Sequence, residues 1–176
     1  MKDRGHYVLG GHSERRQGLG ENDDVVAKKR QAAVRNGIMP VLCIGETLQE
    51  RQQGHTKQVL HNQLTAGLMH LTAREAGAVV IAYEPVWAIG TGEFAKPDQA
   101  EEAITYIRKQ VADLFGERTA QHVRILYGGS VDDHSARSFM DISTCDGVLV
   151  GGASLNYHKF ASIVETAYKV QQERSA

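Results

Sequence analysis

The sequence predicts an α/β fold in which five strand–helix units share one parallel sheet. Short, continuously apolar runs rich in Val, Ile and Leu alternate with longer segments of helical spacing, which is typical of strands covered on both faces. This alternation implies parallel strands joined by right-handed crossovers. At 176 residues, the chain is too short for a closed barrel of eight such units, which needs about 250 residues. We therefore expect residues 1–176 to form one domain whose sheet does not close into such a barrel.

Five apolar runs are the predicted strands. They cover residues 7–9, 39–44, 79–83, 123–127 and 148–150. None shows the polar alternation of a half-exposed strand, so both faces of the sheet should be buried. The first and last runs are expected to be the open edges of the sheet.

The first two long helices are marked by a cap and by leucine spacing. Asn22 is placed to cap a helix that runs through Arg35, and Gly37 closes it. In the second helix, four leucines are expected on one face: Leu60, Leu64, Leu68 and Leu71.

Three further helices follow in the second half of the chain. Pro97 starts the first, Gly116 stops it, and its apolar stripe is Ile104, Ile107, Val111, Leu114 and Phe115. Asp133 is expected to open a short helix that reaches about Met140. Asn156 opens the last helix, whose apolar face should consist of Phe160, Ile163, Val164 and Ala167.

Composition argues against several classes of partner. A content of 41% hydrophobic and 23% charged residues is typical of a folded globular protein. The formal net charge of -1 gives no electrostatic reason to expect nucleic acid or an anionic membrane as a partner. The 8 histidines are scattered without the paired spacing of a zinc site, so no metal is expected.

The cysteines and the first residues bear on the compartment. Cys43 and Cys145 are the two cysteines and lie far apart, which is not a disulfide framework. The start of the chain has no apolar stretch that could act as a signal peptide, and no run reaches membrane-spanning length. We expect a cytoplasmic protein.

A carboxylate follows the third predicted strand. Glu84 lies just beyond the apolar run, Pro85 fixes the backbone after it, and Gly90 and Gly92 end an apolar loop. A carboxylate at a strand end, followed by a loop able to close, suits proton abstraction away from water. The same residue types also fit a strand-end ion pair followed by a plain connecting loop.

Several strings of the sequence are similar to the triosephosphate isomerase family. Residues 83–92, Tyr-Glu-Pro-Val-Trp-Ala-Ile-Gly-Thr-Gly, resemble the family's base-and-lid signature. Four further blocks stand in the family's order, at residues 11–16, 43–46, 127–130 and 150–154. The resemblance implies a TIM barrel of which this chain matches the last five strand–helix units, while the first three have no counterpart here.

The resemblance also implies roles for individual residues. Glu84 would be the base and His12 a neutral electrophile, in the division of roles for which triosephosphate isomerase is itself the reference case. Ser13 would hold the base while the lid is open, and Glu14 matches a position that pairs with an active-site lysine. Cys43 would be a small buried side chain behind the base, not a nucleophile. On residue type alone, a histidine such as His12 is more often a core side chain bonded to a backbone group.

A phosphate site is implied at the glycine-rich loops. Glycines let the backbone approach an anion, and successive N–H groups near a helix start form an anion cradle. By resemblance, the residues of this cradle are Gly90, Ser130, Gly151 and Gly152. The implied reaction interconverts dihydroxyacetone phosphate and glyceraldehyde 3-phosphate through an enediolate, without a cofactor, as a step of glycolysis and gluconeogenesis.

One part of the family's site has no match in this sequence. The family draws an asparagine and a lysine from its first strand and the loop after it. Losing one preorganised donor typically costs about 10²–10³ in rate, so activity of the chain is expected to be weak or lost. The alternatives are an inactive barrel remnant that oligomerises or binds phosphates weakly, and one half of a split enzyme. Because two sheet edges would be open, we expect a homo-oligomer or a partner chain to cover them.

Overall fold

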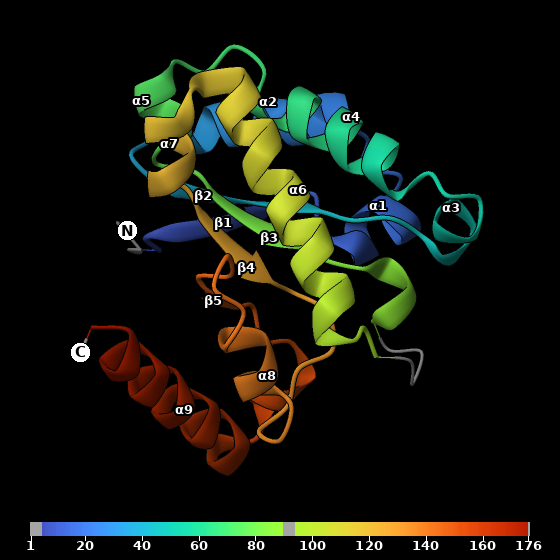
Figure 1. Ribbon diagram of the computed structural model, residues 1–176. Helices are drawn as coiled ribbons and strands as arrows, with labels where there is room; N and C mark the ends of the chain where they lie inside the picture. Colours follow the sequence, from blue (N-terminus) through green and yellow to red (C-terminus); the bar gives the residue numbers. More distant parts are fainter. Residues whose placement is uncertain (1–4, 90–93, 176) are drawn as a thin grey trace.

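The computed structural model describes residues 5–89 and 94–175. Its centre is one sheet of five parallel strands in the order β1-β2-β3-β4-β5 (Figure 1). The strands are β1 (Tyr7–Gly10), β2 (Met39–Ile44), β3 (Val80–Tyr83), β4 (Arg124–Tyr127) and β5 (Gly147–Val148). The predicted α/β class with five parallel strands is confirmed. The sheet is not closed, and β1 and β5 lie at its two ends.

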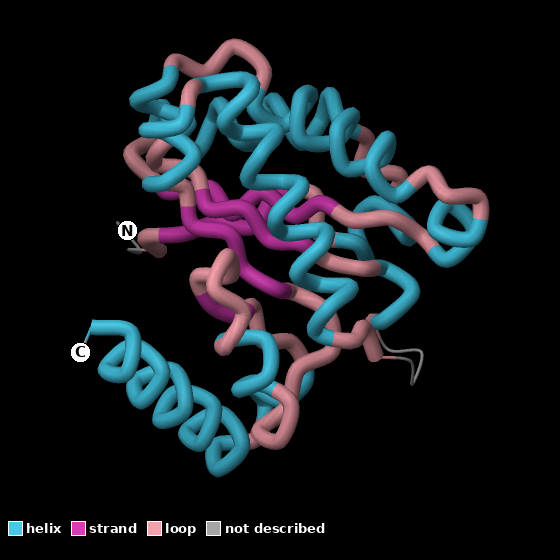
Figure 2. Tube along the Cα trace, in the orientation of Figure 1, coloured by secondary structure: helices cyan, strands magenta, loops and turns pink. Residues whose placement is uncertain are grey.

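The helices surround this sheet unevenly. Helices α2, α4 and α6 lie side by side over one face, whereas α9 packs against α8 at the far end of the molecule (Figures 1 and 2). The helices are α1 (Ser13–Leu19), α2 (Asp23–Arg35), α3 (Leu48–Gln52), α4 (Thr56–Leu68), α5 (Ala73–Ala76), α6 (Pro97–Phe115), α7 (Glu117–His122), α8 (Ala136–Met140) and α9 (Tyr157–Ser175). Two 3₁₀ turns, η1 (Val86–Ala88) and η2 (Gly152–Leu155), follow β3 and β5.

Three of the predicted helix starts are confirmed. The Asn22 side chain accepts a hydrogen bond from the backbone N–H of Val25, and Asn156 accepts one from the N–H of Lys159 in the same way. Pro97 is the first residue of α6, where a missing N–H costs nothing. Local side-chain chemistry therefore fixes where these helices begin.

Two helix boundaries differ from the prediction. Helix α8 begins at Ala136 and not at Asp133, because Asp132 holds the preceding turn by accepting the N–H groups of His134 and Ser135. Helix α4 ends at Leu68, and the chain turns through His70, which has a φ of 64°. Leu71 therefore packs against the core from beyond the helix.

The ends of the molecule also correct two expectations. The last strand is limited to Gly147–Val148, although the N–H of Leu149 still donates to the Tyr127 carbonyl over 2.8 Å. In α9, Ile163 is buried, but the other residues of the predicted apolar face are exposed: Phe160, Val164 and Ala167. The reason is that α9 packs mainly against the short elements α8 and η2. These elements cover a narrow strip of the α9 surface and leave the rest of its apolar face exposed.

Apolar side chains are buried on both faces of the sheet. Alternate residues of β2 and β3, such as Leu42 and Ile81, join the large core beneath the helices. The intervening residues form a smaller cluster on the opposite, inward face: Val41, Cys43, Val80 and Ala82. This two-sided burial explains why β2 and β3 are continuously apolar. The expectation of burial on both faces is wrong for β1, where Tyr7, Val8 and Leu9 are exposed because this strand lies at the open end of the sheet.

Candidate active site

A cavity of about 860 Å³ opens where the strands end. Its lining includes residues that follow β1, β3, β4 and β5, among them His12, Glu84, Ser130, Gly151 and Gly152. Because the carboxyl ends of parallel strands meet at one edge of a sheet, residues far apart in sequence come together here.

Glu84 is the buried carboxylate of the cavity. It is 2% exposed, and its Oε2 accepts the backbone N–H of Ser13 at 3.0 Å. Its Oε1 has no hydrogen-bond partner among the described residues and lies 3.5 Å from Nε2 of His12. One oxygen is thus fixed by the backbone of α1, and the other is available to a ligand.

The tautomer of His12 follows from its position at the start of α1. Its Nδ1 accepts the backbone N–H of Glu14 at 3.3 Å. Since a backbone N–H can only donate, Nδ1 must carry a lone pair, and a neutral ring then bears its proton on Nε2. That Nε2–H lies beside Glu84 Oε1, with 3.5 Å between the nitrogen and the oxygen.

Two glycines, which lack a Cβ, allow neighbouring strand ends to approach Glu84 closely. A Cβ at Gly45 would lie 1.8 Å from the carbonyl oxygen of Glu84, and one at Gly128 would lie 3.0 Å from its Cγ. Ladder hydrogen bonds of 2.7 Å join Glu84 to Ile44 and Gly128 to Tyr83. The carboxylate is therefore carried by rigid strand ends and not by a free loop.

Cys43 lies in the inward-facing cluster behind Glu84 and is buried. The pKa of this thiol is raised, mainly because the thiol is buried and to a lesser extent because the Glu84 carboxylate lies nearby. A neutral buried thiol is a poor nucleophile, in agreement with the interpretation of Cys43 as a packing residue.

Ion pairs to one buried carboxylate, that of Glu21, support the loop that carries His12. Glu21 accepts hydrogen bonds from the backbone N–H of Gly11 at 3.1 Å, from Arg15 Nε at 2.7 Å and from Lys29 Nζ. Burial opposes ionisation of Glu21, but the hydrogen bonds from Lys29, Arg15 and Gly11 together lower its pKa to about 2. Arg16 Nε donates to the Gly11 carbonyl at 2.7 Å, so both backbone polar groups of Gly11 are held.

The predicted phosphate-binding residues come together in part. Ser130 donates to the Ala88 carbonyl through its N–H at 3.1 Å and its hydroxyl at 2.7 Å, which ties this loop to η1. Gly151 and Gly152 lie at the start of η2 and line the cavity, and a Cβ at either would meet nothing within 4 Å. Gly90 lies outside the described residues. Glu14 lines the cavity with an exposed side chain.

Sequence reasoning missed a buried network beside the cavity. The carboxylate of Glu46 is fully buried and accepts from the Tyr83 hydroxyl at 3.1 Å, from Trp87 Nε1 at 3.0 Å and from Arg51 Nη1 at 3.2 Å. The Arg51 guanidinium also stacks 4.5 Å from the centre of the Trp87 ring. Glu46 and Trp87 belong to two of the strings noted in the sequence, but only the fold brings them together with Arg51.

Two features of the described part of the chain bear on other functions. Within residues 5–89 and 94–175, no three His, Cys, Asp or Glu side chains gather in a way that could hold a metal ion. In the same ranges, no helix is both long enough and apolar enough to cross a lipid bilayer.

Comparison with known proteins identifies the family. The model of the family described as triosephosphate isomerase matches residues 2–167. A protein named triosephosphate isomerase from Citrifermentans bemidjiense is 52% identical over 90% of this chain. Proteins of the same name from Chloroherpeton thalassium and Endomicrobium trichonymphae are 48% identical over 92% and 50% identical over 94% of it. The matches cover 63%, 64% and 66% of those relatives, so the chain spans just under two thirds of their length. The match over residues 2–167 shows that this chain belongs to the triosephosphate isomerase family.

Proposed function

We propose that this chain contributes the base, the electrophile and the phosphate-binding loops of a triosephosphate isomerase. The substrate would be a small phosphorylated triose, interconverted between dihydroxyacetone phosphate and glyceraldehyde 3-phosphate without a cofactor. One observation carries the proposal: Nε2 of His12 and Oε1 of Glu84 lie 3.5 Å apart in the cavity that Gly151 and Gly152 also line.

The two side chains divide the proton transfers between carbon and oxygen. Glu84 Oε1 takes the proton from the carbon next to the carbonyl. The electron pair of the C–H bond becomes the second bond between the two carbons, and the π pair of the carbonyl moves onto its oxygen to give an enediolate. The Nε2–H of His12 donates a hydrogen bond to that oxygen as its charge develops. A proton then passes from the hydroxyl of the first carbon to the former carbonyl oxygen by way of His12 Nε2. Return of the abstracted proton from Glu84 to the neighbouring carbon completes the isomerisation and regenerates both groups.

Substrate would be anchored by its phosphate at the loops after β4 and β5. The N–H groups of Gly151 and Gly152 supply backbone donors that suit a dianion at this position, with Gly90 as a further donor by resemblance. Ser130 would join them by turning its N–H or hydroxyl from the Ala88 carbonyl to the phosphate. Lys159 also lines the cavity. Glu14, which is exposed at the rim, would act on the reacting groups only through a partner cation.

Isomerase turnover beside a Glu84→Ala variant tests the proposal. Removing a general base lowers the rate by about 10²–10⁴-fold, and Glu165→Gln on α9 is the matched control because Glu165 is an exposed carboxylate in an i,i+4 pair with Lys169. Turnover that is the same in Glu84→Ala and in the unaltered chain would remove the enzyme assignment.

A second candidate function, one component of an isomerase made from two chains, is favoured by the β1 edge. Tyr7, Val8 and Leu9 are between 43% and 49% exposed, and an uncovered apolar edge strand is a template for pairing. Light scattering after size-exclusion chromatography tests for self-association; a clean monomer with low activity that is restored by a separate chain carrying further barrel strands would favour the two-chain form. An inactive barrel remnant would show no isomerase turnover either alone or mixed with the second chain.

We extend the proposal to a single domain over residues 1–176 and to a location in the cytoplasm. One large core joins side chains from α2 through α9, which supports treating residues 1–176 as a single domain. Cys43 and Cys145 are both free and buried, which supports a reducing cytoplasmic location.

A further inference from the structure

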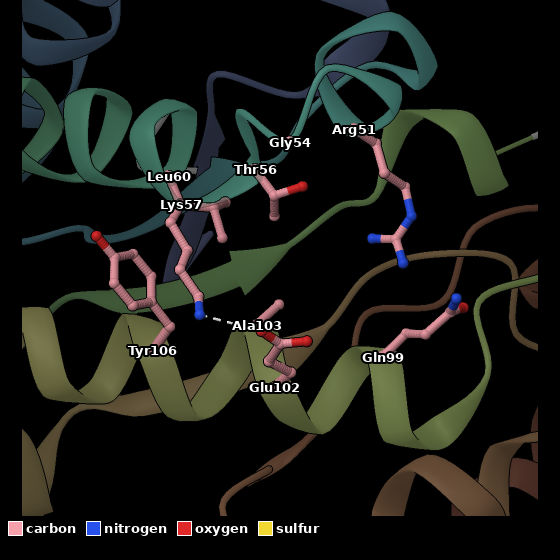
Figure 3. A pocket seen from close by; sticks show the side chains of 9 residues that line it. All are labelled: Arg51, Gly54, Thr56, Lys57, Leu60, Gln99, Glu102, Ala103 and Tyr106. Carbon is pink, nitrogen blue, oxygen red and sulfur yellow. Dashed lines mark ion pairs between the residues drawn. The ribbon is translucent and has the colours of Figure 1, made fainter.

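A second cavity lies on the outer layer of helices. Its volume is about 350 Å³, and it separates α3 and the start of α4 from α6. The buried side chains of Leu60 and Ala103 form its floor. In Figure 3, Arg51, Thr56 and Lys57 extend from one wall, and Gln99, Glu102 and Tyr106 extend from the other.

One wall of this outer cavity is rich in donors. Arg51 and Lys57 supply two cations, and the Thr56 side chain lies between them in Figure 3. Helix α4 begins at Thr56, and its N-cap residue, His55, makes no side-chain capping hydrogen bond, so the first N–H groups of the helix remain available beside the cations. Such a wall favours a compact anion.

The opposite wall is suited to hydroxyl groups. Glu102 pairs with Lys57 over 3.1 Å, but the two side chains are 72% and 61% exposed, and exposed pairs of this kind contribute little free energy. Both groups can therefore exchange this pairing for a ligand. The Gln99 amide and the Tyr106 hydroxyl add a donor and acceptors along the same wall.

Arg51 connects the outer cavity to the segment that follows Glu84. The same guanidinium that lines the cavity donates to the buried carboxylate of Glu46 at 3.2 Å and stacks on Trp87. Trp87 belongs to η1, which begins two residues after Glu84. An anion that draws Arg51 outward would change the hydrogen bonding of Glu46 and, because Trp87 Nε1 donates to Glu46, the environment of the Trp87 indole.

We propose that the outer cavity binds the phosphate monoester of a small polyhydroxylated compound and that its occupancy is transmitted to Trp87 through Arg51. The phosphate is held by Arg51, Lys57 and the first turn of α4, and the hydroxyls by Glu102, Gln99 and Tyr106. This site is distinct from the cavity of Glu84, with which it shares no lining residue.

Amide NMR of the full chain, titrated with inorganic phosphate and with glycerol 3-phosphate, tests the proposal. The reporters are the amides of Gly54 and Thr56 in the outer cavity and the indole N–H of Trp87, the single tryptophan of the chain. We expect saturable shifts at all three with one midpoint, and a lower midpoint for glycerol 3-phosphate than for inorganic phosphate. Equal midpoints for the two ligands would overturn recognition of hydroxyls.

Gln99→Glu is the decisive variant. It adds a negative charge to the cavity while keeping an acceptor for the Lys96 N–H, to which Gln99 Oε1 bonds at 3.0 Å, so α6 should retain its first turn. We expect it to weaken phosphate binding by about tenfold, whereas Gln172→Glu on the exposed side of α9 should change it by less than about twofold. An unchanged midpoint in Gln99→Glu, or no shift at Gly54 and Thr56 in the unaltered chain, would overturn the site.

Gly152→Glu separates the two cavities. A side chain at Gly152 meets no atom within 4 Å, and its carboxylate would repel phosphate from the Glu84 cavity alone. The shifts of Gly54, Thr56 and Trp87 should persist in this variant. If the Trp87 shift vanishes while those of Gly54 and Thr56 remain, the indole reports the Glu84 cavity and the proposed coupling through Arg51 is wrong.

Discussion

The backbone N–H of Glu14 donates to Nδ1 of His12 over 3.3 Å, and this contact decides which nitrogen of the ring faces Glu84. The first turn of α1 thereby fixes a ring orientation that the sequence string at residues 11–16 could only suggest. With Nδ1 occupied, Nε2 is the nitrogen that meets Glu84 Oε1 at 3.5 Å.

The first prediction concerns this tautomer. In the neutral ring, Nδ1 should be unprotonated and Nε2 protonated, because a backbone N–H can donate only to a lone pair. Nitrogen chemical shifts and two-bond nitrogen–proton couplings measure this directly. His158 on the exposed face of α9 is a reference ring. A proton found on Nδ1 of neutral His12 would contradict the arrangement of α1.

The second prediction concerns the close approach of two strand ends at Gly45. Gly45→Ala places a methyl group 1.8 Å from the backbone carbonyl oxygen of Glu84, which cannot be relieved by a side-chain rotation. We expect a loss of about 1–3 kcal/mol in the free energy of unfolding, together with lower isomerase turnover. Gly18→Ala in α1 is the control, since its Cβ would meet nothing within 4 Å. Urea denaturation that gives equal stability for both variants would refute the prediction.

Much of this site could be predicted because strand ends carry it. Glu84 and His12 each follow an apolar run, and parallel strands bring such positions to one edge of the sheet whatever the intervening helices do. The Glu46 network could not be predicted in the same way. Arg51 reaches Glu46 from α3, the helix that the capping box of Thr47 and Glu50 begins, and no spacing rule joins residues 46, 51 and 87.

The exposed face of α9 shows the other limit of pattern reasoning. Helical spacing indicates which residues share a face, but burial depends on what lies opposite. Helical spacing places Phe160 and Val164 on the same predicted face as Ile163, yet only Ile163 of these three belongs to the buried core. The reason is that α8 and η2 cover only a narrow strip of the α9 surface.

The third prediction concerns the pH dependence contributed by Glu21. Its pKa is lowered from 4.5 to about 2 in the folded chain, so its stabilising contribution is present above pH 4.5 and is lost as the pH falls toward 2. The difference in free energy of unfolding between the unaltered chain and Glu21→Gln should therefore be largest near neutral pH and should shrink as the pH falls below 4.5.

Denaturation at a series of pH values measures this difference. Glu101→Gln, at an exposed carboxylate of α6, should cost little at any of them because exposed charges contribute little to stability. A Glu21→Gln difference that stays constant from pH 7 to pH 3 would show that the ion pairs of Glu21 with Arg15 and Lys29 do not stabilise the fold.

The last prediction assigns a positioning role to Lys159. Among the lining residues of the Glu84 cavity in the described part of the chain, it is the one lysine or arginine, and its Nζ lies 4.0 Å from Asp133 Oδ1. Its side chain is half exposed, so its attraction for a substrate phosphate is screened by water and salt. Because that attraction acts on bound substrate and transition state alike, Lys159→Ala should raise KM by about three- to tenfold and leave kcat nearly unchanged. Lys28→Ala on the exposed side of α2 is the control. Steady-state kinetics at two ionic strengths separates the outcomes: added salt should reduce the effect of Lys159→Ala on KM, whereas a loss confined to kcat would place Lys159 in the chemical step and contradict a role in phosphate attraction.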